Sequence, residues 1–130
     1  MSRLVLPVEL RELLTGQVDP LVDVEVLLLL HGSPERAWRA EEIAQALHVD
    51  AVTTAKHLAA LVGGRLARTE SDPPTYRYAP ATPALHDAVE WMRAAYDREP
   101  AALVRALYTG PPRAVRSFAD AFRLRNRRDD

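Results

Sequence analysis

The sequence contains no cysteine among its 130 residues. Without a thiol, the chain can form neither a disulfide framework nor a thiolate metal site, and it has no cysteine nucleophile. Long hydrophobic runs are also missing, since the leucines from Leu27 to Leu30 fall far short of the roughly 20 apolar residues that cross a bilayer. The first residues reach Pro7 without the apolar segment that a signal peptide needs. We therefore expect a soluble cytoplasmic protein.

The chain also lacks a strong charge of either sign, because 17 basic residues nearly balance 18 acidic ones and leave a net charge of −1. A basic footprint is usual in domains that bind nucleic acid, so this balance weakens that function class. Residues 1–31 carry two arginines and five acidic residues, whereas residues 113–130 carry six arginines and three aspartates. The start is therefore acidic and the tail is basic. For the tail, we favour a solvated charged face over a surface that binds an acidic partner or a membrane.

The composition and the spacing of apolar residues predict one folded domain over residues 1–130. Hydrophobic residues make up 48% of the chain and charged residues 27%, which is typical of a globular protein. Helical periodicity predicts helices over residues 7–14, 19–30, 40–47, 50–62, 85–96, 103–110 and 115–122. Asp19 before Pro20 is a start signal for the second helix, and Asp50 is a suitable N-cap for the fourth.

Two short strands are predicted after the fourth helix. They cover residues 65–69 and 76–78, and a polar turn over residues 71–74 joins them. Two helices that meet across a short turn, followed by such a hairpin, have the layout of a winged helix. In this layout the second helix of the pair can lie in the major groove of DNA.

The stretch from WRAEEIA (38–44) through HLAAL (57–61) to LAR (66–68) resembles the helix-turn-helix signature of winged-helix regulators of the MarR and ArsR type. The resemblance covers roughly residues 20–80 and defines a fold better than a function. It implies a mainly α (α+β) fold, with a winged-helix core over residues 19–80, a two-stranded wing, an N-terminal helix and a C-terminal helical extension over residues 81–130. It further implies a transcriptional regulator that binds double-stranded DNA as a homodimer, with the terminal helices at the dimer interface.

Three features depart from the pattern of these regulators. Arg39 stands before the helix over residues 40–47, where Ser or Thr is usual, and a guanidinium cannot accept a hydrogen bond from the helix N-terminus, so another group is expected to cap it. Arg65 precedes Leu66 where glycine is usual, which predicts a rearranged turn. The wing tip over residues 70–74 is acidic, and its charge opposes contact with phosphate.

The helix over residues 50–62 is the predicted reader of DNA. Its core face is expected to consist of Thr54, Leu58, Leu61 and Val62. Its outward face then carries Val52, Thr53, Lys56, His57 and Ala60. Of these, Thr53 and His57 can bond base edges, while Val52 and Ala60 can touch a thymine methyl group. The candidate phosphate contacts are Lys56, Arg65, Arg68 and Arg77. The alternative interpretation is a winged-helix module that binds another protein and leaves these side chains solvated.

No motif indicates catalysis, a metal or a cofactor. The sequence has no GxSxG motif and no phosphate-binding glycine loop, and the adjacent Glu41 and Glu42 point in different directions on a helix. Metal-binding spacing is absent from the four histidines, which we expect at helix ends and surfaces: His31, His48, His57 and His86. Core packing is the expected role of the aromatic residues in the C-terminal helices: Trp91, Tyr96, Tyr108, Phe118 and Phe122. We therefore expect neither an enzyme nor a bound cofactor.

Overall fold

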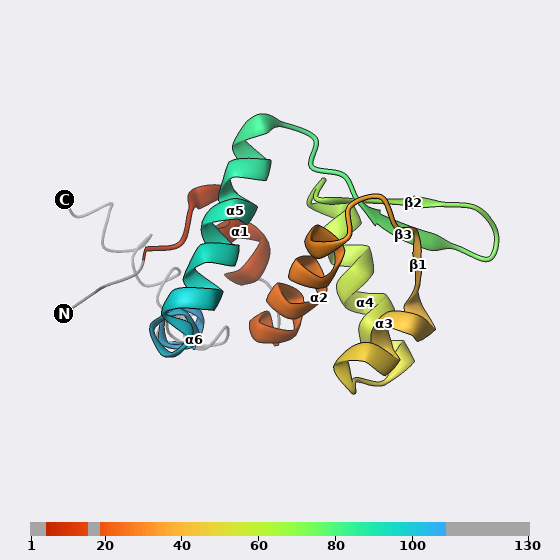
Figure 1. Cartoon of the computed structure of the whole chain (residues 1–130), viewed down its shortest axis with the longest axis horizontal. Helices are drawn as coiled ribbons and strands as arrows, with labels where there is room; N and C mark the ends of the chain where they lie inside the picture. The colour runs from red at the N-terminus through yellow and green to blue at the C-terminus, as the bar shows by residue number, and fades with distance from the viewer. Residues whose placement is uncertain (1–4, 16–18, 109–130) are drawn as a thin grey trace, which may run out of the picture.

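The computed structural model describes residues 5–15 and 19–108, whose elements form three groups in Figure 1. On one side lie the terminal helices α1 (Val8–Thr15), α5 (Pro83–Arg98) and α6 (Pro100–Tyr108). Helix α2 (Pro20–Gly32) occupies the middle. On the other side lie α3 (Ala40–Leu47), α4 (Ala51–Gly63) and the strands β1 (Trp38–Arg39), β2 (Ala67–Glu70) and β3 (Thr75–Tyr78). The helices predicted over residues 7–14, 19–30, 40–47, 50–62 and 85–96 are confirmed to within a few residues.

Some predicted features lie outside the residues that the structure describes, and one predicted helix begins at a different residue. The helix predicted over residues 115–122, the aromatic residues Phe118 and Phe122, and the basic tail all lie outside the described residues. The segment predicted as helical from residue 103 begins earlier, at Pro100, because proline suits the first turn of a helix. None of the described helices is long and apolar enough to cross a membrane.

Polar groups define where the helices begin. The Asp50 carboxylate accepts a 2.7 Å hydrogen bond from the backbone N–H of Thr53, which confirms Asp50 as the N-cap of α4. Helix α3 follows Arg39, whose backbone N–H donates to the Glu42 carboxylate at 2.8 Å. The hydrogen-bond acceptor at this end of α3 is therefore the carboxylate of Glu42 in its first turn, because the guanidinium of Arg39 cannot accept a hydrogen bond.

The three strands form one antiparallel sheet in the order β1-β3-β2. The wing hairpin pairs Ala67 with Tyr78 and Glu70 with Thr75, while β1 pairs Trp38 with Tyr76 on the other edge of β3. Two strands were predicted from the sequence. Strand β1 was not predicted, because a strand of two residues is too short to show an alternating pattern.

The turn after α4 places a non-glycine residue in a backbone conformation that favours glycine. Arg65 adopts a φ of 63°, in the left-handed region that favours glycine. The preceding glycines do not take this conformation, because Gly63 ends the helix and Gly64 has a φ of −82°. The Arg65 carbonyl accepts a 3.0 Å hydrogen bond from the N–H of Ala81, which holds this turn against the exit of the wing.

The hydrophobic core is centred on α2. Its largest fully buried side chains come from α1, α2, α3, α4, α5, α6 and the segment after α4, and they include Leu10, Leu27, Leu30, Ile43, Leu58, Leu61, Leu66, Met92 and Leu103. Trp91 and Tyr96 pack against this core as half-buried side chains. The order of the helices and the pairing of the three strands make this fold a winged helix, of mainly α (α+β) class, with α1 before it in the chain and α5 and α6 after it.

Candidate nucleic-acid interface

Helix α4 is the element that a winged helix offers to the major groove, and its first turn is fixed by Asp50. Besides the bond to the Thr53 N–H, the Asp50 carboxylate accepts a 2.7 Å hydrogen bond from the Thr53 hydroxyl. These bonds, led by the one from the Thr53 backbone, lower the pKa of Asp50. Thr53 was predicted to bond a base edge, yet its hydroxyl proton is already given to this cap.

The two faces of α4 separate largely as predicted. Thr54, Leu58 and Leu61 are buried, and Val62 is half-buried against the core. On the outward side, the Val52 residue is 69% exposed and Lys56 is exposed as well, while Ala60 is half-buried. An apolar side chain as open as Val52, one turn from a lysine, is suited to a thymine methyl beside a phosphate.

The prediction that His57 lies on the outward, DNA-reading face of α4 is wrong. The residue is only 6% exposed, and its Nδ1 lies 2.6 Å from the Oδ1 atom of Asp23 in α2. Its position explains this, because residues 54, 57, 58 and 61 form one i, i+3, i+4, i+7 face of the helix. His57 therefore points into the core and presents no group to a base. The expectation that the histidines lie at helix ends and surfaces is wrong for this one.

The arginines of the wing are compensated by a neighbouring carboxylate. Arg68 and Arg77 both reach Glu70, at 3.6 Å and 3.4 Å respectively. Residues 38–80 contain five basic and five acidic side chains, so this region has no net charge at neutral pH. By contrast, Lys56 and the exposed Arg65 form no ion pair within the part of the chain that the structure describes. Arg39, also exposed, has no ion pair within the described residues either, whereas Arg68 and Arg77 must leave Glu70 before they can bind phosphate.

Comparison with known proteins gives one solved structure of related shape. The structure of a MarR family protein from Bacillus stearothermophilus matches with a TM-score of 0.49 and 14% sequence identity, over 91% of this chain and 80% of that one. No family model matches the chain, and no curated protein does. The winged-helix assignment rests on the helices and strand pairing described above. The fold is a winged helix.

A fully buried carboxyl group lies in α2 of this winged helix, at a residue that the sequence did not single out. Asp23 is 0% exposed and sits in α2, next to the buried Val24. Burial raises the pKa of its carboxyl group, and the hydrogen bond with His57 acts in the opposite direction. The available signal was an aspartate inside the apolar stretch from Leu21 to Leu30, where an unpaired carboxylate is costly.

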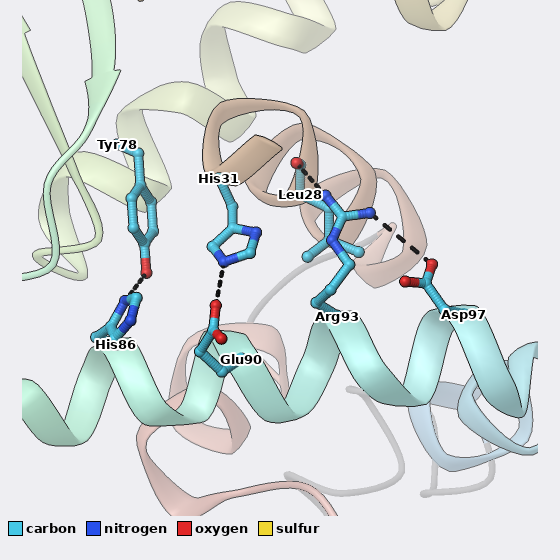
Figure 2. Close-up of polar contacts among 7 residues, drawn as sticks. All are labelled: Leu28, His31, Tyr78, His86, Glu90, Arg93 and Asp97. Atoms are coloured by element: carbon cyan, nitrogen blue, oxygen red, sulfur yellow. Dashed lines mark hydrogen bonds and ion pairs between the residues drawn. The ribbon is translucent and has the colours of Figure 1, made fainter. Parts of the chain in front are cut away.

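A second polar feature is a seam between α2 and α5, most of which is drawn in Figure 2. It consists of three antiparallel contacts, spaced three residues apart on each helix: Glu25 with Tyr96 at 3.4 Å, the Leu28 carbonyl with Arg93 at 2.6 Å, and His31 with Glu90 at 2.5 Å. We call this set the α2–α5 seam. It joins the winged helix to the C-terminal helices by side chains that are only partly buried.

At its wing end, the α2–α5 seam meets a small cluster of rings. The Tyr78 hydroxyl and the Nδ1 atom of His86 are hydrogen-bonded at 2.9 Å, and the His31 ring lies edge-on to the Tyr78 ring with centroids 5.3 Å apart (Figure 2). Burial raises the pKa of Tyr78 to about 12. Among the residues that the structure describes, no three His, Asp or Glu side chains gather closely enough to hold a metal ion. The cluster therefore packs the junction of α2, β3 and α5.

Proposed function

We propose that this chain is a DNA-binding transcriptional regulator that reads duplex DNA with the outward face of α4. The observation that carries the proposal is the open first half of that helix, where Val52 is 69% exposed and Lys56 has no ionic partner within the described residues. A major groove is wide enough to admit one helix, so this face can approach base edges. The proposed base contacts are the Val52 side chain and the Thr53 hydroxyl oxygen, which can still accept a hydrogen bond while its proton is held by Asp50. The proposed phosphate contacts are Lys56, Arg65, Arg68 and Arg77.

The proposal includes a homodimer formed through the terminal helices. Four of the five large exposed hydrophobic residues in the described part of the chain belong to α1, α6 or the segment just before α1: Val5, Val8, Val104 and Tyr108. A second copy would cover these side chains and would supply a second α4 for a two-fold related half-site. In this arrangement residues 19–80 read DNA and residues 81–130 contribute to dimerisation, within one domain that acts in the cytoplasm without enzymatic activity.

The DNA proposal is tested by fluorescence anisotropy against the duplex upstream of the protein's own gene and against an unrelated duplex, over a series of salt concentrations. We expect tighter binding to the upstream duplex and a steady loss of affinity with added salt. Lys56→Ala should weaken binding to both duplexes and lower the salt slope by about one. Arg98→Ala, which changes an exposed arginine at the end of α5, is the matched control and should leave both unchanged.

Dimerisation is tested separately by sedimentation equilibrium. Val8→Glu combined with Val104→Glu should shift the protein towards the monomer, because charge would replace apolar surface on α1 and α6. Val52→Glu, at a valine on α4 that is more exposed than either, should leave the association unchanged. A shift caused by the α4 variant alone would place the interface on the proposed DNA-binding face and would contradict the arrangement.

A second candidate function is a protein-interaction module built on the same scaffold. The observation that favours it is the wing, where Glu70 compensates Arg68 and Arg77 and the tip adds a further acidic residue, Asp72. Such a wing is better suited to a basic protein surface than to phosphate. Failure of the chain to bind either duplex even at low salt would favour this function over the first.

A further inference from the structure

The contact between α2 and α4 contains one buried, directional hydrogen bond. Asp23 of α2 and His57 of α4 are joined at 2.6 Å between Oδ1 and Nδ1, with side chains 0% and 8% exposed. Among the described residues, the buried polar or charged ones are these two and Thr54. The Thr54 hydroxyl donates to the Asp50 carbonyl at 2.9 Å, so it does not leave its own helix. The Asp23–His57 pair is therefore the buried polar link between the two helices in this part of the chain.

Stability does not account for this pair. The second carboxylate oxygen of Asp23, Oδ2, is buried and has no hydrogen-bond partner among the described residues. Taking a carboxylate out of water is costly, and a single hydrogen bond to an imidazole offsets only part of that cost. A buried carboxyl group and its basic partner can often be replaced together by apolar side chains of similar volume without loss of stability. The role of the pair must therefore lie in the geometry that its hydrogen bond imposes on the two helices.

A directional contact fixes the rotation of a helix, whereas apolar side chains tolerate sliding. His57 follows Lys56 directly and lies about one turn from Val52 and Thr53, so any rotation that moves His57 also re-aims the proposed reading face. Contacts to base edges need side chains held within a narrow range of positions and angles. We infer that Asp23 and His57 are a positioning pair that sets the rotation of α4 on α2 and thereby sets DNA sequence specificity. This inference rests on the proposed function for its second half.

The test compares three variants with the wild-type chain. Asp23→Leu with His57→Leu removes the hydrogen bond without leaving either partner unpaired in the core. His57→Asn keeps a nitrogen donor that can take the place of Nδ1. Thr54→Val is the matched control, since it removes a buried hydroxyl from the same face of α4 without removing a hydrogen bond to α2. Residual dipolar couplings of the amide groups in α2 and α4 report the relative orientation of the two helices, and anisotropy reports the ratio of affinities for the upstream and unrelated duplexes.

We expect the double leucine variant to melt at or above the wild-type temperature, to change the orientation of α4, and to lose at least about tenfold of the specificity ratio. His57→Asn and Thr54→Val should keep the wild-type orientation and a ratio within about threefold. A double leucine variant with wild-type orientation overturns the inference. Should that variant not fold, Asp23→Ala with His57→Phe replaces it under the same criteria.

The two proposals fail differently in this experiment. Equal affinity of the wild-type chain for both duplexes contradicts the proposed function, and the helix orientation then decides the positioning role alone. A specific wild-type chain whose double leucine variant keeps the full specificity ratio contradicts the positioning role and leaves the proposed function in place.

Discussion

Helix α2 carries a carboxylate–imidazole pair on each of two sides, and the two pairs differ in burial. Toward α4, His57 and Asp23 approach to 2.6 Å with side chains 8% and 0% exposed. Toward α5, His31 and Glu90 approach to 2.5 Å with side chains 15% and 55% exposed. Burial raises the pKa of Asp23, whereas the hydrogen bond from His31 lowers the pKa of Glu90. From this difference we expect solvent access, more than contact distance, to decide how such a pair acts on the fold.

Removal of the imidazole from the buried pair should cost the most stability. His57→Leu leaves Asp23 as an unpaired carboxyl group in the core, and we expect a loss of about 3–5 kcal/mol in the free energy of unfolding. Urea titration at neutral pH measures this loss. His31→Leu is the control, because its partner Glu90 remains in contact with water, and its effect should be much smaller. Equal losses would contradict the role given to burial.

The α2–α5 seam should be weakened most by a change at Arg93. Arg93→Met removes the 2.6 Å hydrogen bond to the Leu28 carbonyl and keeps most of the side-chain volume. We expect a loss of about 1 kcal/mol, which is less than that of a fully buried charged hydrogen bond because the arginine is one-third exposed. Arg98→Met, on the same helix, should have no measurable effect. Chemical denaturation of the two variants side by side measures the difference.

The two pairs should give stability opposite dependences on pH. The lowered pKa of Glu90 contributes stability that is present above its ordinary value of 4.5 and is lost as pH falls through the lower folded value. The raised pKa of Asp23 means that the native chain retains a proton that the unfolded chain releases, so stability falls as pH rises from 3.8 towards the folded value.

Thermal unfolding of variants between about pH 3 and about pH 7 separates these contributions. The deficit of Glu90→Gln against the wild type should be largest at the upper end and should shrink as pH falls through the lowered pKa of Glu90. Asp23→Asn should instead gain on the wild type as pH rises. If the stability of both variants relative to the wild type changed in the same direction with pH, burial would not distinguish the two carboxyl groups.

The smallest expected effect concerns backbone strain and lies away from both pairs. Arg65→Gly should raise the free energy of unfolding by about 0.5 kcal/mol, since glycine adopts the left-handed conformation of this turn without steric cost. Arg65→Ala removes the same side chain but keeps a β-carbon, so it should bring no gain. A gain of equal size in the alanine variant would trace the effect to the arginine side chain and not to the backbone.

Much of the fold could be predicted from the sequence because local signals agree with it. Asp50 is the N-cap of α4, Pro20 and Pro83 stand at the first positions of α2 and α5, and the wing strands follow α4 as expected. Strand β1 could not be predicted, because two residues form a strand only through pairing with β3. The Glu42 contact at the start of α3 was also missed, although a glutamate at the third helical position is a known capping signal.

The candidate site was predicted less well, because residue type was given more weight than position. His57 was assigned to the outward face as a polar residue, although its spacing from Thr54, Leu58 and Leu61 places it on the core face. Asp23 gave no recognisable signal of a partner, since the residues that pair are 34 positions apart in the sequence. The ion pair of Arg77 with Glu70 likewise depends on the register in which β2 and β3 pair.

The most direct test of the central claim is an amide NMR titration of the full chain with the duplex upstream of its gene. We predict that chemical shift changes concentrate on the first half of α4, at Val52, Thr53 and Lys56, and extend to Arg65. The α2–α5 seam, followed at Glu90 and Arg93, should remain nearly unchanged. Changes that concentrate on α1 and α6, or no changes at all at saturating duplex, would contradict the claim that α4 reads DNA.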